Sequence, residues 1–235
     1  MARMRQVTVL MAALLCVSCV ASAAENKGQI AACSRPLSKA IPNSCVVSPG
    51  VLWRGSKPDR AGAEALLSLG VRTVVNLELL HDDIKSFQVA QPAKVLSEKL
   101  DYFHIREWEP NPVILPSVLD SHVVEFLAIV KTQPKPIYVH CRSGQNRTGV
   151  MVAAYRVLLE GSSPESAIDE MGKYKGFWFK YDAKYINSLK GKHRTTLDAL
   201  IKSRLKDVRP IARLTCSVKG CEEVKYEQRT SLTTA

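Results

Sequence analysis

The sequence predicts an α/β fold, with a central, mostly parallel sheet of four to five strands and helices on both sides of it. Short apolar runs with the length of buried strands alternate with segments in which apolar residues recur at helical spacing, an order typical of layered α/β folds. Glycines and prolines separate these segments. The 235 residues are 46% hydrophobic and 23% charged, which indicates a globular chain with a substantial core.

The first strand–helix–strand unit is expected between residues 51 and 77. Residues 51–54 predict a short strand, after which Asp59 can cap a helix that continues to Leu69 and ends at Gly70. The apolar run VRTVVNL, at 71–77, predicts a buried strand. A polar stretch, a short helix and another strand should follow, at 81–94, up to about Lys99, and at 102–105.

The next segment, REWEPNPVILP at 106–116, contains three prolines and predicts an ordered loop. Ser117, with Asp120 three residues later, predicts the start of a helix that continues to about Lys131. Residues 137–140 predict a buried strand, which leads into a polar loop. Helices are then expected at 148–160 and 164–173, with one or two more within 174–206.

The first 24 residues have the layout of a secretory signal peptide. Arg3 and Arg5 precede an uncharged run that ends in the small residues ASAA before Glu25. We therefore expect residues 1–24 to be cleaved and the protein to be exported. An uncleaved membrane anchor is the alternative, which a run barely long enough to span a bilayer disfavours. Beyond the signal we expect an irregular segment, a folded domain and a loosely ordered tail, over 25–50, 51–206 and 207–235.

Five cysteines lie beyond the predicted signal peptide. Four of them form local pairs near the chain ends, and an oxidising compartment favours the disulfides Cys33–Cys45 and Cys216–Cys221, with unpaired thiols as the alternative. Cys141 is then left without a partner. Neither a C-x-x-C motif nor a neighbouring histidine gives the cysteines the spacing of a zinc site, so we expect no metal.

The formal net charge of +11 indicates an anionic partner. Nucleic acid, anionic lipid and phosphorylated substrates all fit this charge, which does not choose among them. The basic segment 184–209 is either a solvated helix face or a contact with a membrane surface or an acidic partner. No sequence pattern indicates the oligomeric state.

The loop HCRSGQNRTG, which begins at His140, is the strongest candidate for a functional site. A loop between a buried strand and a helix directs backbone N–H groups and the positive end of the helix dipole into one concavity, which suits a bound oxyanion. The same field favours the thiolate of Cys141. Arg147 can offer two parallel N–H donors to phosphate oxygens, and Gly144 leaves the turn unobstructed. Thr148 can hydrogen-bond the sulfur, and His140 can orient the loop.

These residues match the H-C-x5-R-[ST] signature of cysteine-dependent protein tyrosine and dual-specificity phosphatases. His140, Cys141, Gly144, Arg147 and Thr148 are all in register. The flanking segments, from VLWRGSKP through LLSLGVRTVVNL and YFHI to AIDEMGKY, resemble the compact dual-specificity-like branch found in bacteria. The resemblance covers residues 51–174 and implies a dual-specificity-phosphatase-like fold, with the catalytic domain over 51–206.

The resemblance implies a bacterial hydrolase that cleaves phosphate monoesters through a cysteinyl-phosphate intermediate and needs no cofactor. Phosphorylated proteins, with phosphotyrosine favoured, are the expected substrates, and no nucleic-acid partner is expected. Phosphoinositides or inositol polyphosphates are alternative substrates, and a phospho-ligand-binding pseudophosphatase is an alternative function. Sulfur transfer or arsenate reduction fits the motif less well. The loop residues expected to hold phosphate beside Arg147 are Arg142, Ser143, Gly144, Gln145, Asn146 and Thr148.

The family normally supplies a general acid, an Asp, from a mobile loop about thirty residues before the nucleophile. The segment 106–116 occupies this place and contains no Asp. Glu109 is the favoured substitute because Trp108-Glu109-Pro110 resembles the family's loop, in which Trp and Pro flank the acid. Glu107 is the alternative, and another residue or no acid at all are the remaining alternatives, the last of which corresponds to a pseudophosphatase.

Two further features have competing interpretations. Arg54, on the first strand, either assists anion binding at the pocket or pairs with a surface carboxylate. A group of aromatic residues after the last matched segment forms either a recognition surface or, more commonly, core packing. These residues are Tyr174, Phe177, Trp178, Phe179 and Tyr181.

Overall fold

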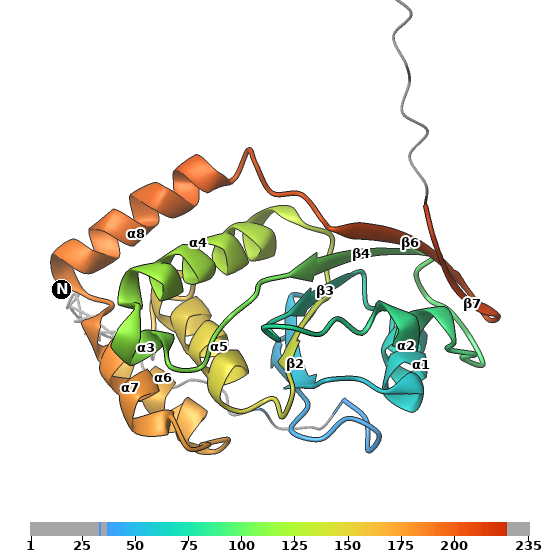
Figure 1. The fold of residues 1–235 in the computed structure, drawn as a ribbon, viewed down its shortest axis with the longest axis horizontal. Coiled ribbons are helices and arrows are strands. Elements are labelled where there is room, and N and C mark those ends of the chain that lie inside the picture. The colour runs from blue at the N-terminus through green and yellow to red at the C-terminus, as the bar shows by residue number, and fades with distance from the viewer. Residues whose placement is uncertain (1–32, 34–36, 225–235) are drawn as a thin grey trace, which may run out of the picture.

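A computed structural model describes Cys33 and residues 37–224, which form a seven-stranded sheet with helices on both faces (Figure 1). The strand order is β1-β2-β5-β3-β4-β6-β7. The predicted α/β class is confirmed, but the sheet is mixed and larger than the predicted four to five strands. The strands are β1 Cys45–Ser48, β2 Leu52–Ser56, β3 Thr73–Asn76, β4 Lys99–His104, β5 Ile137–Cys141, β6 Ala212–Ser217 and β7 Gly220–Glu223.

The centre of the sheet is parallel and its edges are antiparallel. Strand β5 lies between β2 and β3, and β4 follows β3, all in parallel. Strand β1 pairs with β2, and β6 and β7 extend the sheet beyond β4, all antiparallel. The segment 25–50 was expected to be irregular and 207–235 loosely ordered, but β1 lies in the first and β6 and β7 lie in the second. Residues 25–32, 34–36 and 225–235 of these segments lie outside the described residues. Strand β6, ARLTCS, has no continuous apolar run and instead alternates buried and exposed residues, which is typical of a half-covered strand.

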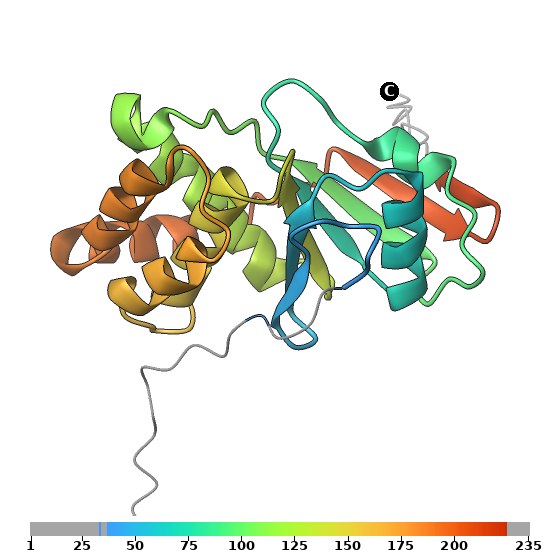
Figure 2. The ribbon, with the colours of Figure 1, turned by 90° about the horizontal axis from the view of Figure 1, so that it is seen from below.

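The helices form two layers (Figure 2). Helices α1 (Arg60–Leu69) and α2 (Ile84–Gln88) cover one face of the sheet, where Leu66, Leu67 and Phe87 are fully buried. The larger helical group covers the other face, with an apolar cluster built mainly from α4 and α5. Its members are α3 Asn111–Ile114, α4 Pro116–Thr132, α5 Asn146–Leu158, α6 Pro164–Gly172, α7 Phe179–Ser188 and α8 Gly191–Arg204.

Predicted helix ends are confirmed where a capping residue marks them. The Asp59 side chain accepts a hydrogen bond from the Gly62 N–H at 2.8 Å, and Gly70 ends α1 with a φ of 86°, in the left-handed region. Ser163 caps α6 in the same way, with Pro164 at the first helical position.

The helix predicted from Ser117 to about Lys131 is confirmed as α4, which begins one residue earlier, at Pro116, because proline lacks the N–H that the first turn leaves unpaired. Two other local predictions were wrong. The segment predicted as a loop over 106–116 contains the single turn α3. No helix leads up to Lys99; the helix of this region is α2, which begins earlier and buries Phe87.

Both predicted disulfides, Cys33–Cys45 and Cys216–Cys221, are present, and Cys141 is the free cysteine of the described part. The predicted signal peptide, 1–24, lies outside the described residues. Within the described residues no helix is long and apolar enough to cross a membrane, and no cluster of side chains could hold a metal ion. The basic segment 184–209 contains all of α8, which buries Leu197 and Ile201 and exposes most of its polar side chains.

Candidate active site

Cys141 is the last residue of β5, which lies between β2 and β3 in the parallel group. The chain turns immediately after it and enters α5 at Asn146, slightly earlier than the predicted Thr148. We call residues 141–147 the Cys141 loop. It lies at the carboxyl ends of parallel strands, where α/β folds generally bind ligands. The Cys141 side chain is fully buried.

Three successive carbonyl groups of the Cys141 loop are fixed from outside. The Lys57 N–H donates to the Arg142 carbonyl at 3.3 Å, the Asn43 side-chain amide donates to the Ser143 carbonyl at 2.8 Å, and the Arg54 guanidinium donates to the Gly144 carbonyl. In a planar trans peptide the N–H points opposite to the C=O. The N–H groups of the next residues therefore point toward the inside of the loop, as an oxyanion cradle requires.

Gly144 is required by the close approach of two backbone segments. A Cβ at this position would lie 2.5 Å from the Gly55 carbonyl carbon and 2.7 Å from the Ser56 nitrogen, and the φ of Gly144 is +72°. Only glycine fits both constraints. Strand β2 thus forms the outer wall of the Cys141 loop.

Arg54 is buried against the backbone of the Cys141 loop and does not pair with a surface carboxylate. Its side chain is fully buried, and its guanidinium lies 4.0 Å from the centre of the Tyr174 ring. Burial lowers the pKa of Arg54, although nearby groups, including Tyr174 and Glu170, oppose this shift. The surface alternative is therefore wrong, and Arg54 contacts the backbone of the loop.

Arg147 connects the Cys141 loop to residues 106–116, which we call the Glu109 loop. Arg147 Nη1 donates to the Leu77 carbonyl at 3.1 Å and to the Glu107 carbonyl at 3.4 Å. Arg147 Nη2 lies 3.3 Å from Glu109 Oε1. Around Arg147, the buried atoms Asn146 Oδ1, Arg147 Nε and Thr148 Oγ1 have no hydrogen-bond partner among the described residues. Such polar atoms favour a polar ligand.

The two candidate acids have different surroundings. The Glu107 side chain is 2% exposed, accepts a hydrogen bond from the Asn111 side chain at 3.0 Å and contacts His122 Nδ1. The Glu109 side chain is 32% exposed and faces Arg147. The Glu107 carboxylate therefore stabilises the start of α3 and α4, whereas the Glu109 carboxylate is accessible to a ligand.

Comparisons with known proteins agree with this arrangement. The family model described as a DSP-PTPase phosphatase fused to NAD+ kinase matches residues 42–195, which include both loops. The chain belongs to this family.

Among curated relatives, a dual specificity protein phosphatase, TpbA of Pseudomonas aeruginosa, is 29% identical over 128 residues, which are 54% of this chain and 51% of the relative. The chain spans about half the length of the TpbA relatives it matches.

Two solved structures show the same fold. The crystal structure of P. aeruginosa TpbA has a TM-score of 0.50 at 21% identity and covers 72% of this chain and 99% of its own. The core catalytic domain of the PP-IP phosphatase SIW14 from S. cerevisiae has a TM-score of 0.52 at 17% identity and covers 72% of this chain and 97% of its own.

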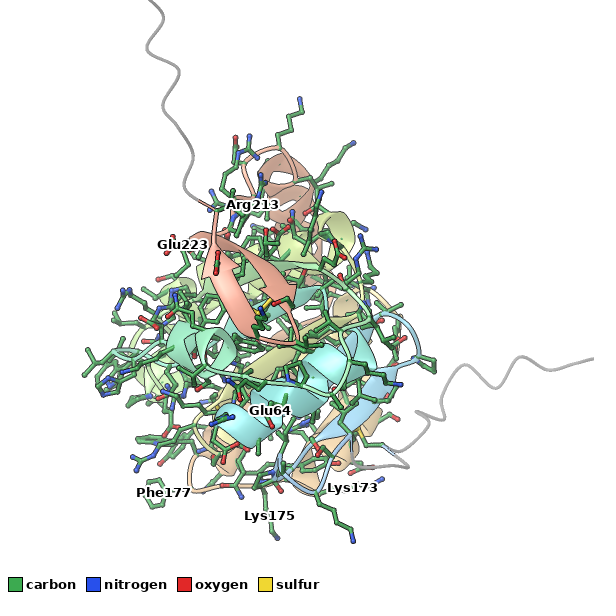
Figure 3. All side chains as sticks on the ribbon, turned by 90° about the vertical axis from the view of Figure 1, so that its right-hand side faces the viewer. Glu64, Lys173, Lys175, Phe177, Arg213 and Glu223 are labelled. Atoms are coloured by element: carbon green, nitrogen blue, oxygen red, sulfur yellow. A yellow bond between two sulfur atoms is a disulfide. The ribbon has the colours of Figure 1, made fainter. Side chains whose placement is uncertain are left out.

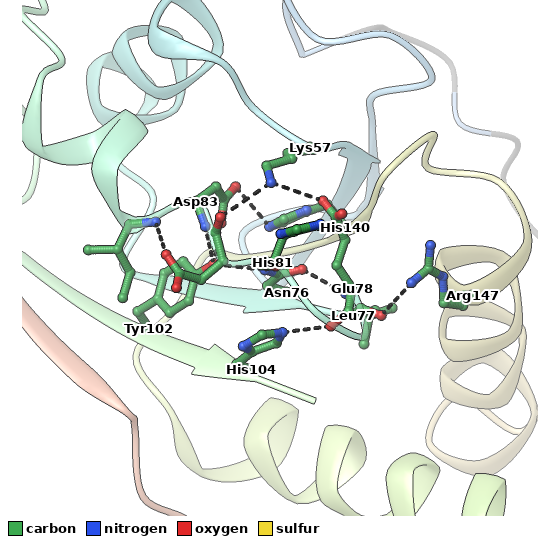
Figure 4. A network of polar contacts seen from close by, with 12 residues as sticks. Lys57, Asn76, Leu77, Glu78, His81, Asp83, Tyr102, His104, His140 and Arg147 are labelled. Atoms are coloured by element: carbon green, nitrogen blue, oxygen red, sulfur yellow. Dashed lines mark hydrogen bonds and ion pairs between the residues drawn. The ribbon is translucent and has the colours of Figure 1, made fainter. Parts of the chain in front are cut away.

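In this DSP-PTPase family member, a buried polar network lies behind the Cys141 loop (Figure 4). His140 Nε2 lies 3.3 Å from Asp83 Oδ2, and both side chains are fully buried. Asp83 also contacts the Tyr102 hydroxyl, which accepts a hydrogen bond from the Asn76 side chain at 3.0 Å. Burial lowers the pKa of His140, and the negative charge of Asp83 opposes this shift. The network fixes the residue that precedes Cys141.

Sequence reasoning missed Asp83 because it occurs in a polar stretch, HDD, without regular spacing. The pairing with His140 depends on β3 and β5 lying side by side, with Asn76 opposite His140. Lys57 adds an ion pair to Glu78 at 3.3 Å on the same side of the loop (Figure 4). Only the tertiary fold brings these groups together.

Asp182 is a second candidate that sequence reasoning missed. It lies on α7, is 2% exposed, and lines a small pocket with Glu107, Glu109, Asn146 and Arg147. Burial raises the pKa of Asp182 to about 8, and the negative charges of Glu109 and Glu107 add to the shift. The surrounding segment FKYDAKY contains no motif that marks Asp182, so no sequence signal was available to find it.

The remaining predicted site residues lie around the rim. Arg142 and Ser143 are exposed, whereas Gln145 and Asn146 are half-buried. Some members of the predicted aromatic group pack in the core, and others are exposed. Tyr174 and Phe179 pack against the core, while Phe177 is 86% exposed. The exposed Lys173, Lys175 and Phe177 side chains point outward along one edge of the molecule (Figure 3).

Proposed function

We propose that the chain is a phosphatase that hydrolyses phosphate monoesters through a cysteinyl-phosphate intermediate on Cys141. This proposal rests on one observation. Hydrogen bonds from outside the loop hold the carbonyl groups of Arg142, Ser143 and Gly144 so that they point away from the loop interior. This orientation leaves a ring of inward N–H donors beside a buried thiol, and Arg147 borders the same loop. This arrangement suits a phosphoryl group better than a sulfur-transfer or redox substrate.

In the first step, the Cys141 thiolate attacks phosphorus while the ester P–O bond breaks. The loop N–H groups and Arg147 hold the phosphoryl oxygens, so Arg147 exchanges its contact with Glu109 for the substrate. Glu109, in its protonated form, donates a proton to the leaving oxygen. In the second step, Glu109 accepts a proton from water, the water oxygen attacks phosphorus, and the S–P bond breaks to release phosphate.

Phosphorylated protein side chains, including phosphotyrosine, are the proposed substrates. The P. aeruginosa relative TpbA is named a dual specificity protein phosphatase, and the family model matches residues 42–195, which contain the Cys141 loop. Half-buried Gln145 and the exposed Arg142 border the mouth of the loop, where a peptide would lie.

A phosphoinositide or inositol polyphosphate is the second candidate substrate. Arg142, Lys173 and Lys175 are exposed and basic, and a substrate with several phosphates, or one at an anionic membrane surface, would match them. The exposed Phe177 could enter the interface of such a membrane.

Export to the periplasm or the medium is part of the proposal. Two disulfides in a chain of this size support an oxidising compartment, because such bonds are rare in the cytosol. Cell fractionation, with mass determination of the mature N-terminus, tests this point; an intact residue 1 in the cytosolic fraction would contradict it.

A phosphate-release panel tests the function. Phosphotyrosyl and phosphoseryl peptides, phosphoinositides and phytate are offered to the mature protein and to the variants C141S, E109Q and E107Q. Turnover by the wild type and loss in C141S support the cysteinyl mechanism, and turnover also excludes a pseudophosphatase. A loss confined to E107Q would transfer the role of the acid to Glu107.

A further inference from the structure

The pocket beside Arg147 contains more carboxyl groups than cations. Glu107, Glu109, Asp182 and Arg147 are the charged side chains that line it. Arg147 is bonded to Glu109. No ion pair among the described residues joins Asp182 to a cation.

Within the part of the chain that the structure describes, the elements around α7 offer Asp182 no cationic partner. From α4, His122 contacts Glu107, which lies in the same pocket. From α6, the Glu170 carboxylate is bonded to Arg156 at 2.8 Å. A buried carboxylate without a cation, close to other carboxylates, is costly, and such a group retains its proton. The pKa of Asp182, raised to about 8, follows from the same burial and charges.

We propose that Asp182 is a positioning residue that shares one proton with Glu109, so that this carboxyl pair serves as both general acid and general base at neutral pH. The inference rests on the proposed function. Glu109 already forms an ion pair with Arg147. A second carboxyl in the pocket keeps a proton available.

The carboxyl pair holds the same number of protons before and after one turnover. Before attack, the pair holds one proton, which moves to the leaving oxygen through Glu109 as the P–O bond breaks and the S–P bond forms. The pair is then doubly ionised and acts as a strong base. In the second step it takes one proton from the attacking water through Glu109, the S–P bond breaks, and inorganic phosphate leaves. The pair again holds one proton.

The test is the pH dependence of kcat/KM for D182N with two substrates. A phosphotyrosyl peptide needs a proton on its leaving oxygen, whereas a dinitrophenyl phosphate does not. In the wild type, peptide hydrolysis should fall above about pH 8, where Asp182 titrates. In D182N this decline should move at least about 2 units lower, and kcat/KM at pH 7 should fall about tenfold or more. Hydrolysis of the dinitrophenyl ester should fall less than that of the peptide, because this substrate needs the carboxyl pair only for the second step. Circular dichroism shows whether the variant folds.

D120N is the matched control. Asp120 is a carboxylate of α4 that contacts Tyr185 and His193 rather than Arg147, so its pH profile should equal that of the wild type. The double variant D182N/E109Q adds a second readout. If Asp182 acts through Glu109, D182N should have no further effect on peptide hydrolysis in the E109Q background.

The possible failures are distinguishable. An unchanged pH profile in D182N, or an additive double variant, overturns the role of Asp182 while the dinitrophenyl ester is still hydrolysed. If the wild type hydrolyses neither substrate, or C141S hydrolyses both, the proposed function itself fails.

Discussion

The Cys141 loop and the Glu109 loop meet at Arg147 but are held in different ways. The Cys141 loop is fixed by backbone and side-chain donors to three of its carbonyls and by the tight fit of Gly144 against β2. The Glu109 loop is anchored at its base by Glu107 and His122, and Glu109 contacts the rest of the site through a partly exposed ion pair with Arg147. A rigid cradle therefore faces an acid that can be displaced by a ligand.

The largest expected effect comes from a substitution in the rigid Cys141 loop. Replacing Cys141 with Ser removes the nucleophile while leaving the loop backbone unchanged, so phosphate release should fall at least about a thousandfold. The melting temperature should be unchanged within error. Residual turnover above one per cent of wild type would show that another group makes the covalent bond.

Gly144→Ala should disrupt the cradle itself. The new Cβ would meet the Gly55 and Ser56 backbone, and the loop must move, so activity should fall about a hundredfold and stability by about 2 kcal/mol or more.

Gly161→Ala is the matched control for this change. Gly161 has nearly the same φ, +73°, but nothing lies within 4 Å of its Cβ position. It should lose about 1 kcal/mol and no activity. Chemical denaturation and initial rates measure both quantities. Equal effects of the two changes would mean that backbone conformation, rather than contact with β2, fixes the loop.

Two substitutions in the Glu109 loop should have different effects, one on the reaction rate and the other on stability. E109Q should lower kcat for a phosphotyrosyl peptide about a hundredfold without changing stability, because Glu109 is partly exposed. E107Q should destabilise the protein by about 1 to 3 kcal/mol, because it weakens a buried contact with His122. If E109Q instead destabilises the fold, the loop depends on its ion pair and is not displaceable.

The contribution of Asp182 to the free energy of unfolding should depend on pH. Its pKa in the folded state, about 8, is above that of an unfolded Asp, so its favourable contribution is complete below about pH 4 and is lost as the pH rises toward 8. D182N removes this titration. Its free energy of unfolding relative to the wild type should therefore increase between pH 4 and pH 8, by about 1 kcal/mol or more. A difference that is constant with pH would show that Asp182 is not protonated in the fold.

The smallest effect on activity is expected far from both loops. Replacing Cys216 and Cys221 with Ser opens a short loop at the sheet edge, which should cost at most about 2 kcal/mol. The phosphate-release rate at 25 °C should not change. A loss of activity would indicate that the β6–β7 edge is coupled to the Cys141 loop.

The sequence predicted the Cys141 loop well because its determinants are local. A buried strand, a glycine and an arginine at fixed spacing lie within ten residues, and the caps of Asp59 and Ser163 are equally local. Asp83 and Asp182 could not be predicted, because their partners are 57 and 73 positions away in the chain, at His140 and Glu109. Strands β6 and β7 were missed for a related reason: β6 alternates buried and exposed residues and β7 is short and half polar, so their pairing depends on β4 rather than on their own apolar content.

The position of β5 also has a consequence for the order of folding. Strands β2 and β3 precede β5 in the chain, yet both pair with it and are not hydrogen-bonded to each other. The centre of the sheet can therefore close only when β5 inserts between them, and the same event delivers Cys141 to the donors that hold its loop. Because such long-range pairing makes folding slow, catalytic competence should appear together with the last cooperative step of refolding.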